Sequence, residues 1–101
     1  MDIRSAQKLA WENKTEKGFN TTNTPLEFGL LTAEVSEAFT AWRKGLPDFG
    51  EELADAFLYL TALAEMNGVD LDHEVTQKIE KNAKRTYQRN AHGAHIRVSD
   101  G

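Results

Sequence analysis

The feature that most constrains this chain is the segment at residues 51–68, EELADAFLYLTALAEMNG, which is apolar at almost every position from Leu53 to Ala64. A helix that is apolar on nearly all sides has to be surrounded by other helices, from its own chain or from a second subunit. Asp55 lies inside this run, and an unpaired ionised carboxylate in an apolar interior costs on the order of several kcal/mol. The segment therefore predicts a buried central helix whose carboxylate has a compensating partner.

Turn and capping signals divide the rest of the chain into helices and give no convincing strand. The sequence at 24–27, Thr-Pro-Leu-Glu, has the form of a capping box with proline at the first helical position. Gly45 and Gly68 follow the ends of two apolar-periodic segments, as is typical of helix C-termini. We expect four helices at about residues 2–14, 24–44, 48–68 and 70–89. Because the loops are short, the prediction is an all-α four-helix bundle over residues 1–90, followed by an irregular tail at 91–101.

Length, cysteine content and hydropathy limit the class of protein further. A chain of 101 residues fits one domain, and it contains no cysteine, which excludes disulfides and Cys-ligated metal sites. The first residues lack the apolar core of a signal peptide, and no apolar run approaches the roughly 20 residues of a membrane span. We expect a soluble, cytoplasmic protein with no membrane partner.

The charge is distributed unevenly along the chain. Residues 1–77 hold 6 Lys/Arg and 14 Asp/Glu, whereas residues 78–101 hold 6 Lys/Arg and 2 Asp/Glu. A nucleic-acid polymer would require a broad positive face, so we do not expect one as a partner. An acidic body with a basic end instead suits a site that holds cations on one side and phosphates on the other.

Two pairs of carboxylates have the spacing of neighbours on a helix face. Glu34 and Glu37 are three residues apart in the second predicted helix, and Glu52 and Asp55 have the same spacing in the third. If these helices are antiparallel, both pairs can face one space, and four carboxylates there would suit Mg²⁺, with Mn²⁺ as a substitute. By spacing alone most such pairs belong to a solvated acidic face, and Asp55 could be a core acid bonded to Tyr59 or to a lysine of the last helix.

The last predicted helix supplies groups that complement the carboxylates. Lys78, Asn82 and Arg85 follow a 4, 3 spacing and therefore share one face. A lysine and an arginine provide charge and donors for phosphate, and an amide can bridge phosphates and carboxylates. An ordinary exposed face is the alternative.

Three further residues are candidates for substrate binding. Trp11 and Trp42 could stack on a base, although helical tryptophans are also common in cores and interfaces. His92, in the predicted tail, could contact phosphate if the tail becomes ordered.

Taken together, the chain resembles the MazG-like, all-α nucleoside triphosphate pyrophosphohydrolases, in the short single-domain form found in phages and bacteria. The matching motifs are EVSE at 34–37, ELAD at 52–55 and KIEKNAKR at 78–85, in this order and with short gaps. The resemblance extends over about residues 26–87. One departure is Thr86-Tyr87, where such proteins often have a proline soon after the arginine.

The resemblance implies Mg²⁺-dependent hydrolysis of a (deoxy)nucleoside triphosphate to the monophosphate and pyrophosphate, in nucleotide-pool housecleaning, by a homodimer or homotetramer. The implied metal ligands are Glu34, Glu37, Glu52 and Asp55, with Glu37 also the candidate general base. Lys78 and Arg85 would stabilise charge on the phosphates, and Asn82 would orient a phosphate or a ligand.

Three other interpretations compete with this enzyme. The first is a catalytically weak relative that binds nucleotides or a partner protein as a regulator. A di-iron bundle would require Glu-x-x-His pairs, and neither motif helix contains histidine. A purely structural helical oligomer would leave Asp55 and the Lys-Asn-Arg face without a role.

Overall fold

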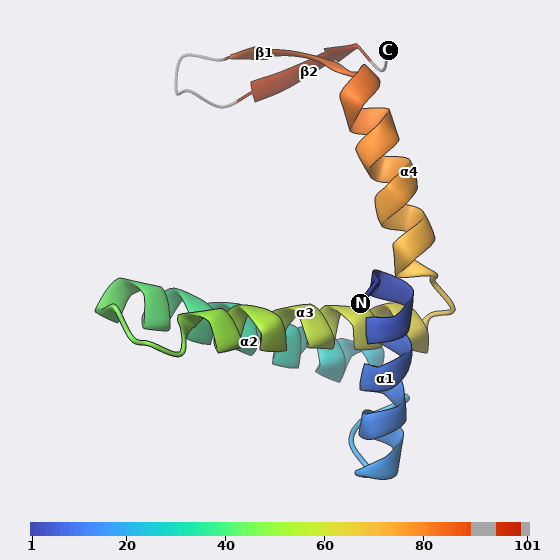
Figure 1. The fold of residues 1–101 in the computed structure, drawn as a ribbon, viewed down its shortest axis with the longest axis vertical. Coiled ribbons are helices and arrows are strands. Elements are labelled where there is room, and N and C mark those ends of the chain that lie inside the picture. The colour runs from blue at the N-terminus through green and yellow to red at the C-terminus, as the bar shows by residue number, and fades with distance from the viewer. Residues whose placement is uncertain (90–94, 100–101) are drawn as a thin grey trace. The chain divides into compact units, whose positions relative to one another are not determined.

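The computed structural model describes residues 1–89 and 95–99. They form four helices, α1 (Ile3–Glu16), α2 (Thr24–Lys44), α3 (Phe49–Met66) and α4 (Leu71–Lys84), and two short strands, β1 (Thr86–Arg89) and β2 (His95–Ser99) (Figure 1). The predicted all-helical class is confirmed, with the strands as an addition. The chain divides into two compact units, residues 1–71 and residues from 72 onward, and each is described by itself. Over the described ranges, no helix combines the length and the apolar character needed to cross a membrane.

In the first unit, α2 and α3 lie side by side as an antiparallel pair, and α1 packs against α3 (Figure 1). The turn between α2 and α3 depends on Gly45, whose φ of 65° lies in the left-handed region that other residues rarely adopt. Its backbone N–H donates to the carbonyl oxygen of Trp42, which closes the helix end. This turn places the acidic segments of the two helices opposite each other.

Helix α2 begins at Thr24, as predicted, but its N-terminal cap differs from the predicted one. Asn23 caps the helix, because its side-chain oxygen accepts a hydrogen bond of 3.0 Å from the backbone N–H of Leu26. Glu27 was predicted to complete a capping box with Thr24, and this is wrong. The Glu27 side chain is fully buried and bonds to α1 and the preceding loop.

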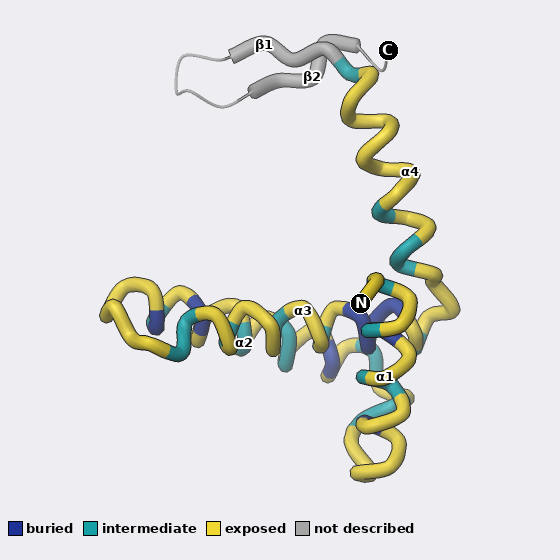
Figure 2. The backbone as a smooth tube through the Cα atoms, viewed as in Figure 1, coloured by how far each residue is buried: buried dark blue, intermediate teal, exposed yellow. Residues whose placement is uncertain are grey.

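The core of the first unit is small. Among the described residues, the buried apolar ones are Ala38, Ala41, Ala62, Leu63 and Ala64. Figure 2 shows how short the buried stretches of the backbone are, in dark blue. In the single chain Leu53, Phe57 and Leu60 of α3 are exposed, so the expected coverage of this helix on all sides, in part by a second subunit, stays a prediction. Asp55 is likewise exposed rather than buried. The reason is that α2 covers only one side of α3, and α1 packs only against the C-terminal part of α3.

The second unit consists of α4 and a hairpin that we did not predict. Residues 86–89 were expected to continue the last helix and 91–101 to be irregular, but Thr86–Arg89 and His95–Ser99 pair as antiparallel strands. The register sets Tyr87 opposite Arg97 and Gln88 opposite Ile96. β-branched and aromatic residues favour strands, and the alternation of Ile96 and Val98 has the period of a strand.

Candidate metal centre

Three carboxylates of α2 and α3 converge in the first unit. Glu34 and Glu37 lie one turn apart on α2, and Glu52 faces them from the first turns of α3. One oxygen from each residue lies within 4.8 Å of the other two. The antiparallel pairing on either side of Gly45 therefore brings together three of the four residues predicted as metal ligands.

Two oxygens of this cluster are buried without a hydrogen-bond partner among the described residues. They are Oε2 of Glu34 and Oε2 of Glu52, and Oδ1 of the nearby Asp48 has the same status. Buried polar atoms are nearly always bonded in folded proteins, so each exception calls for an explanation. Carboxylate oxygens that converge in this way fit a hard divalent cation such as Mg²⁺ or Mn²⁺, which binds oxygen ligands.

The electrostatics of the cluster point in the same direction. Burial, followed by the negative charge of Glu37, raises the pKa of Glu34 above its ordinary value. Burial, again followed by the charge of Glu37, raises the pKa of Glu52. Among the described residues, no positively charged group is a cause of either shift, and a bound cation would reverse both.

Asp55 occupies a different position from the one we expected. It is exposed, and it does not belong to the group of oxygens within 4.8 Å of one another. Its charge nevertheless contributes to the raised pKa values of Glu34 and Glu52. Asp55 therefore lies close enough to influence the cluster, at the edge that leads to a neighbouring pocket.

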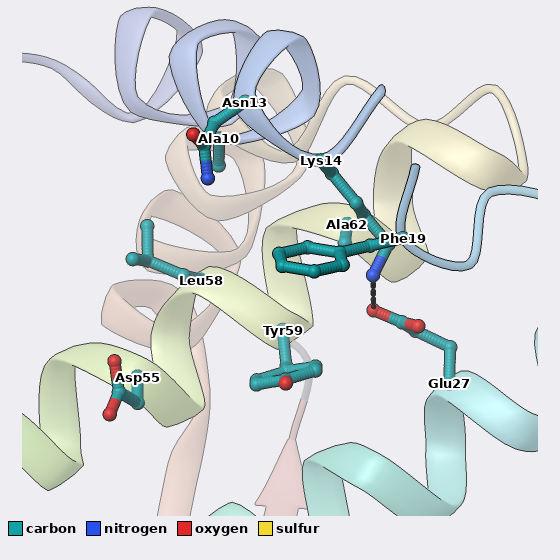
Figure 3. A pocket seen from close by; sticks show the side chains of 9 residues that line it. All are labelled: Ala10, Asn13, Lys14, Phe19, Glu27, Asp55, Leu58, Tyr59 and Ala62. Atoms are coloured by element: carbon teal, nitrogen blue, oxygen red, sulfur yellow. Dashed lines mark ion pairs between the residues drawn. The ribbon is translucent and has the colours of Figure 1, made fainter. Parts of the chain in front are cut away.

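This pocket has a volume of about 210 Å³ and lies between α1, the loop after it, α2 and α3. Figure 3 shows Asp55 and Leu58 on one side of it, Ala10 and Asn13 above, and the rings of Phe19 and Tyr59 in the middle. Burial raises the pKa of Tyr59, and the charge of Glu34 is the next cause. The pocket therefore combines two aromatic rings with an amide and a carboxylate, directly beside the acidic cluster.

One wall of the pocket is a buried ion pair that the sequence did not reveal. Lys14 Nζ lies 2.9 Å from Oε2 of Glu27 (Figure 3). Asn20 donates a hydrogen bond of 3.1 Å to the other Glu27 oxygen. Lys14 Nζ also lies 5.5 Å from the centre of the Tyr59 ring. No local spacing links Lys14 to Glu27. Their only sequence signal is that each falls at an apolar-periodic position of its helix.

The remaining predicted residues are described within their own units. In the second unit, Arg85 Nη1 donates to Asn82 Oδ1 at 3.1 Å, so these two residues do share a face, while Lys78 is exposed. In the first unit, Trp11 is half-buried and Trp42 is exposed, and neither lines the pocket. His92 lies outside the described residues.

Comparison of the chain with protein-family models, with curated proteins and with solved structures gave no match. The fold defines a predominantly helical protein, and its most distinctive feature is the acidic cluster between α2 and α3. A functional conclusion must therefore come from the residues and geometry described above.

Proposed function

We propose that this protein is a Mg²⁺-dependent nucleotide pyrophosphohydrolase of the MazG-like type, which converts a (deoxy)nucleoside triphosphate to the monophosphate and pyrophosphate. The observation that carries the proposal is the convergence of Glu34, Glu37 and Glu52 within 4.8 Å, with two buried oxygens that lack partners in the described part of the chain. A cluster that merely improved solubility would leave its oxygens in water. The motif order in the sequence supplies the reaction class.

The pocket beside the cluster supports a nucleoside as the organic part of the substrate. Phe19 and Tyr59 offer ring faces for a base, and stacking on aromatic rings is worth ~1–3 kcal/mol per base. Asn13 offers both a donor and an acceptor for a base edge. Asp55 lies at the boundary between the pocket and the acidic cluster, where the sugar and the first phosphate would meet.

The chemistry follows from the roles these residues can play. When bound, Mg²⁺ supplies charge neutralisation for the triphosphate and increases the acidity of water. Glu34 and Glu52 hold their oxygens in place from two helices that are fixed by the turn at Gly45. Glu37, the exposed member, is placed to accept the proton of the water that attacks the α-phosphorus. The bond from that phosphorus to the bridging oxygen breaks, and pyrophosphate leaves.

In this proposal Lys78 and Arg85 keep the phosphate-binding roles that the resemblance implies. Stabilisation of the developing negative charge by such groups commonly contributes more to phosphoryl transfer than any other effect. Asn82, which accepts a hydrogen bond from Arg85, would fix the orientation of the guanidinium.

Product analysis tests the proposal. The purified protein is incubated with each dNTP and NTP, with Mg²⁺ or with EDTA, and the nucleotide and pyrophosphate products are separated and quantified. We expect monophosphate and pyrophosphate in equal amounts, only with Mg²⁺, and a loss of at least ~100-fold in kcat for Glu34→Gln. Glu51→Gln is the matched control, because Glu51 is an exposed acid of α3 outside the cluster.

Two results would contradict the proposal. One is release of a nucleoside diphosphate and inorganic phosphate, which would place the attack at the γ-phosphorus. The other is that folded, Mg²⁺-binding protein hydrolyses none of the nucleotides. This result would favour a nucleotide-binding regulator.

A further inference from the structure

The pocket lined by Phe19 and Tyr59 is small for a ligand site. Its volume of about 210 Å³ corresponds to about seven water molecules at ~30 Å³ each, and ligand pockets usually measure about 300–1,000 Å³. Ala10 on α1 and Ala62 on α3 contribute only methyl groups to its lining. Neither side chain can rotate away to enlarge the pocket, so the spacing of the helix backbones sets its size.

A buried ion pair closes one end of the pocket. The pair is Lys14 and Glu27, and Figure 3 shows it on the far side of the Phe19 and Tyr59 rings from Asp55. The Glu27 side chain is 0% exposed and that of Lys14 is 9% exposed. Displacing either side chain would leave the other charge buried without its partner, which is strongly unfavourable. The pair therefore limits how far a ligand can extend into the pocket.

Hydrogen bonds hold the loop that carries Phe19. The Phe19 backbone N–H donates to the carbonyl oxygen of Lys14 at 2.9 Å. The Asn20 side chain donates to Glu27 at 3.1 Å and to the carbonyl oxygen of Asn23 at 2.8 Å, and it accepts from the Asn23 N–H at 3.0 Å. These bonds join the loop to the buried ion pair. The Phe19 ring is therefore placed at the pocket before a ligand binds.

The lining of the pocket suits one planar heterocyclic ring. Phe19 and Tyr59 offer ring faces for stacking, and Leu58 adds an aliphatic contact. Asn13 presents a donor and an acceptor on one amide, which matches the adjacent donor and acceptor on the edge of a pyrimidine. The same amide turned over serves cytosine and uracil or thymine alike, because the donor and the acceptor exchange places between these bases. A single pyrimidine ring therefore finds partners for its faces and for its edge.

We propose that this pocket selects pyrimidine over purine nucleotides by size, with the buried pair of Lys14 and Glu27 as the wall that stops a second ring. The inference rests on the proposed function, since it requires the triphosphate at the acidic cluster and the base in the pocket. A purine would meet the wall before its sugar reached the edge at Asp55. Its α-phosphorus would then be held away from Glu34 and Glu52, and a displacement of about 1 Å can cost ~100-fold in rate.

The turnover of individual nucleotides tests the selection. The full chain is incubated with Mg²⁺ and with dCTP, dUTP, dTTP, dATP or dGTP, and kcat/KM is determined from the monophosphate formed. We expect kcat/KM for each pyrimidine nucleotide to exceed that for either purine nucleotide by at least ~10-fold, because a pocket of fixed size discriminates strongly against a larger ligand.

Leu58→Ala tests whether the size of the pocket causes the preference. The substitution removes most of one side chain from the lining, so it should make room for the second ring of a purine. We expect the ratio of pyrimidine to purine kcat/KM to fall at least ~5-fold. Leu60→Ala is the matched control, because both leucines lie on α3 and are 42% exposed, but Leu60 is outside the pocket lining. Its ratio should equal that of the wild type.

Equilibrium binding separates this inference from the proposed function. Non-hydrolysable α,β-imido analogues of dUTP and dATP are titrated into the protein with Mg²⁺, and their dissociation constants are measured by calorimetry. If no nucleotide is hydrolysed, the proposed function fails, and a dissociation constant at least ~10-fold lower for the dUTP analogue still supports selection by size. Equal dissociation constants, or no binding of either analogue, would overturn the inference. Equal kcat/KM values for purines and pyrimidines, or an unchanged ratio in Leu58→Ala, would overturn it as well.

Discussion

The buried pair of Lys14 and Glu27 should hold the first unit together, and removing one partner tests this directly. The Glu27 side chain is 0% exposed and that of Lys14 is 9% exposed, with their charged atoms 2.9 Å apart. Lys14→Met leaves the buried Glu27 carboxylate with the Asn20 amide as its one remaining donor in the described part of the chain. The variant therefore converts a compensated buried charge into an uncompensated one.

The expected cost is about 3 kcal/mol of unfolding free energy. Removing one partner of a buried ion pair typically costs about 3–5 kcal/mol. The lower end applies here because Oε2 of Glu27 has no hydrogen-bond partner among the described residues, so its contact with Lys14 is an ion contact outside good hydrogen-bond geometry. With a slope of about 1–3 kcal/mol per molar urea, the unfolding midpoint should fall by roughly 1–3 M.

Urea unfolding followed by circular dichroism, at one fixed protein concentration, measures this shift. The double variant Lys14→Met, Glu27→Leu removes both charges and should recover to within about 1 kcal/mol of the wild type. Arg4→Met is the matched control, since Arg4 forms an exposed ion pair with Asp70 at 3.0 Å and should cost less than about 1 kcal/mol. A loss below about 1 kcal/mol for Lys14→Met, or a double variant less stable than either single one, would show that the buried pair does not hold the unit together.

Two further predictions concern the acidic cluster and the helix turn. Because the pKa values of Glu34 and Glu52 are raised, the folded protein in EDTA binds more protons than the unfolded chain just above the ordinary pKa of 4.5. The unfolding free energy should therefore fall as the pH rises above 4.5. Urea unfolding should show that this fall is missing in a Glu34→Gln, Glu52→Gln variant. Equal pH slopes for the wild type and the variant would disprove the prediction. Gly45→Ala should lower the unfolding free energy by about 1–2 kcal/mol because φ is 65° there. Gly29 lies in the interior of α2, and an added Cβ there would have nothing within 4 Å. Gly29→Ala should therefore raise the unfolding free energy by about 0.5–1 kcal/mol. Similar effects of the two substitutions would contradict this expectation.

Local signals in the sequence are enough to predict the helical elements of the first unit. The bounds of α2 were predicted from the proline near its start and from Gly45 after its end, and both signals act within a few residues. The i, i+3 spacing of Glu34 and Glu37 fixed their common face in the same way. The end of α4 was missed because helical and strand preferences compete at residues 84–89, and the strand there depends on its pairing with residues 95–99.

The way these elements meet depends on tertiary packing. The sequence could not show that Glu27 pairs with Lys14 instead of capping its own helix, because the two residues come together only when α1 packs against the α2–α3 pair. It also could not show that Asp55 lies at the rim of a pocket while Glu52, one turn earlier, faces the cluster. Both outcomes depend on the rotation of each helix about its axis, which is set by packing against neighbours and not by the spacing of residues along the chain.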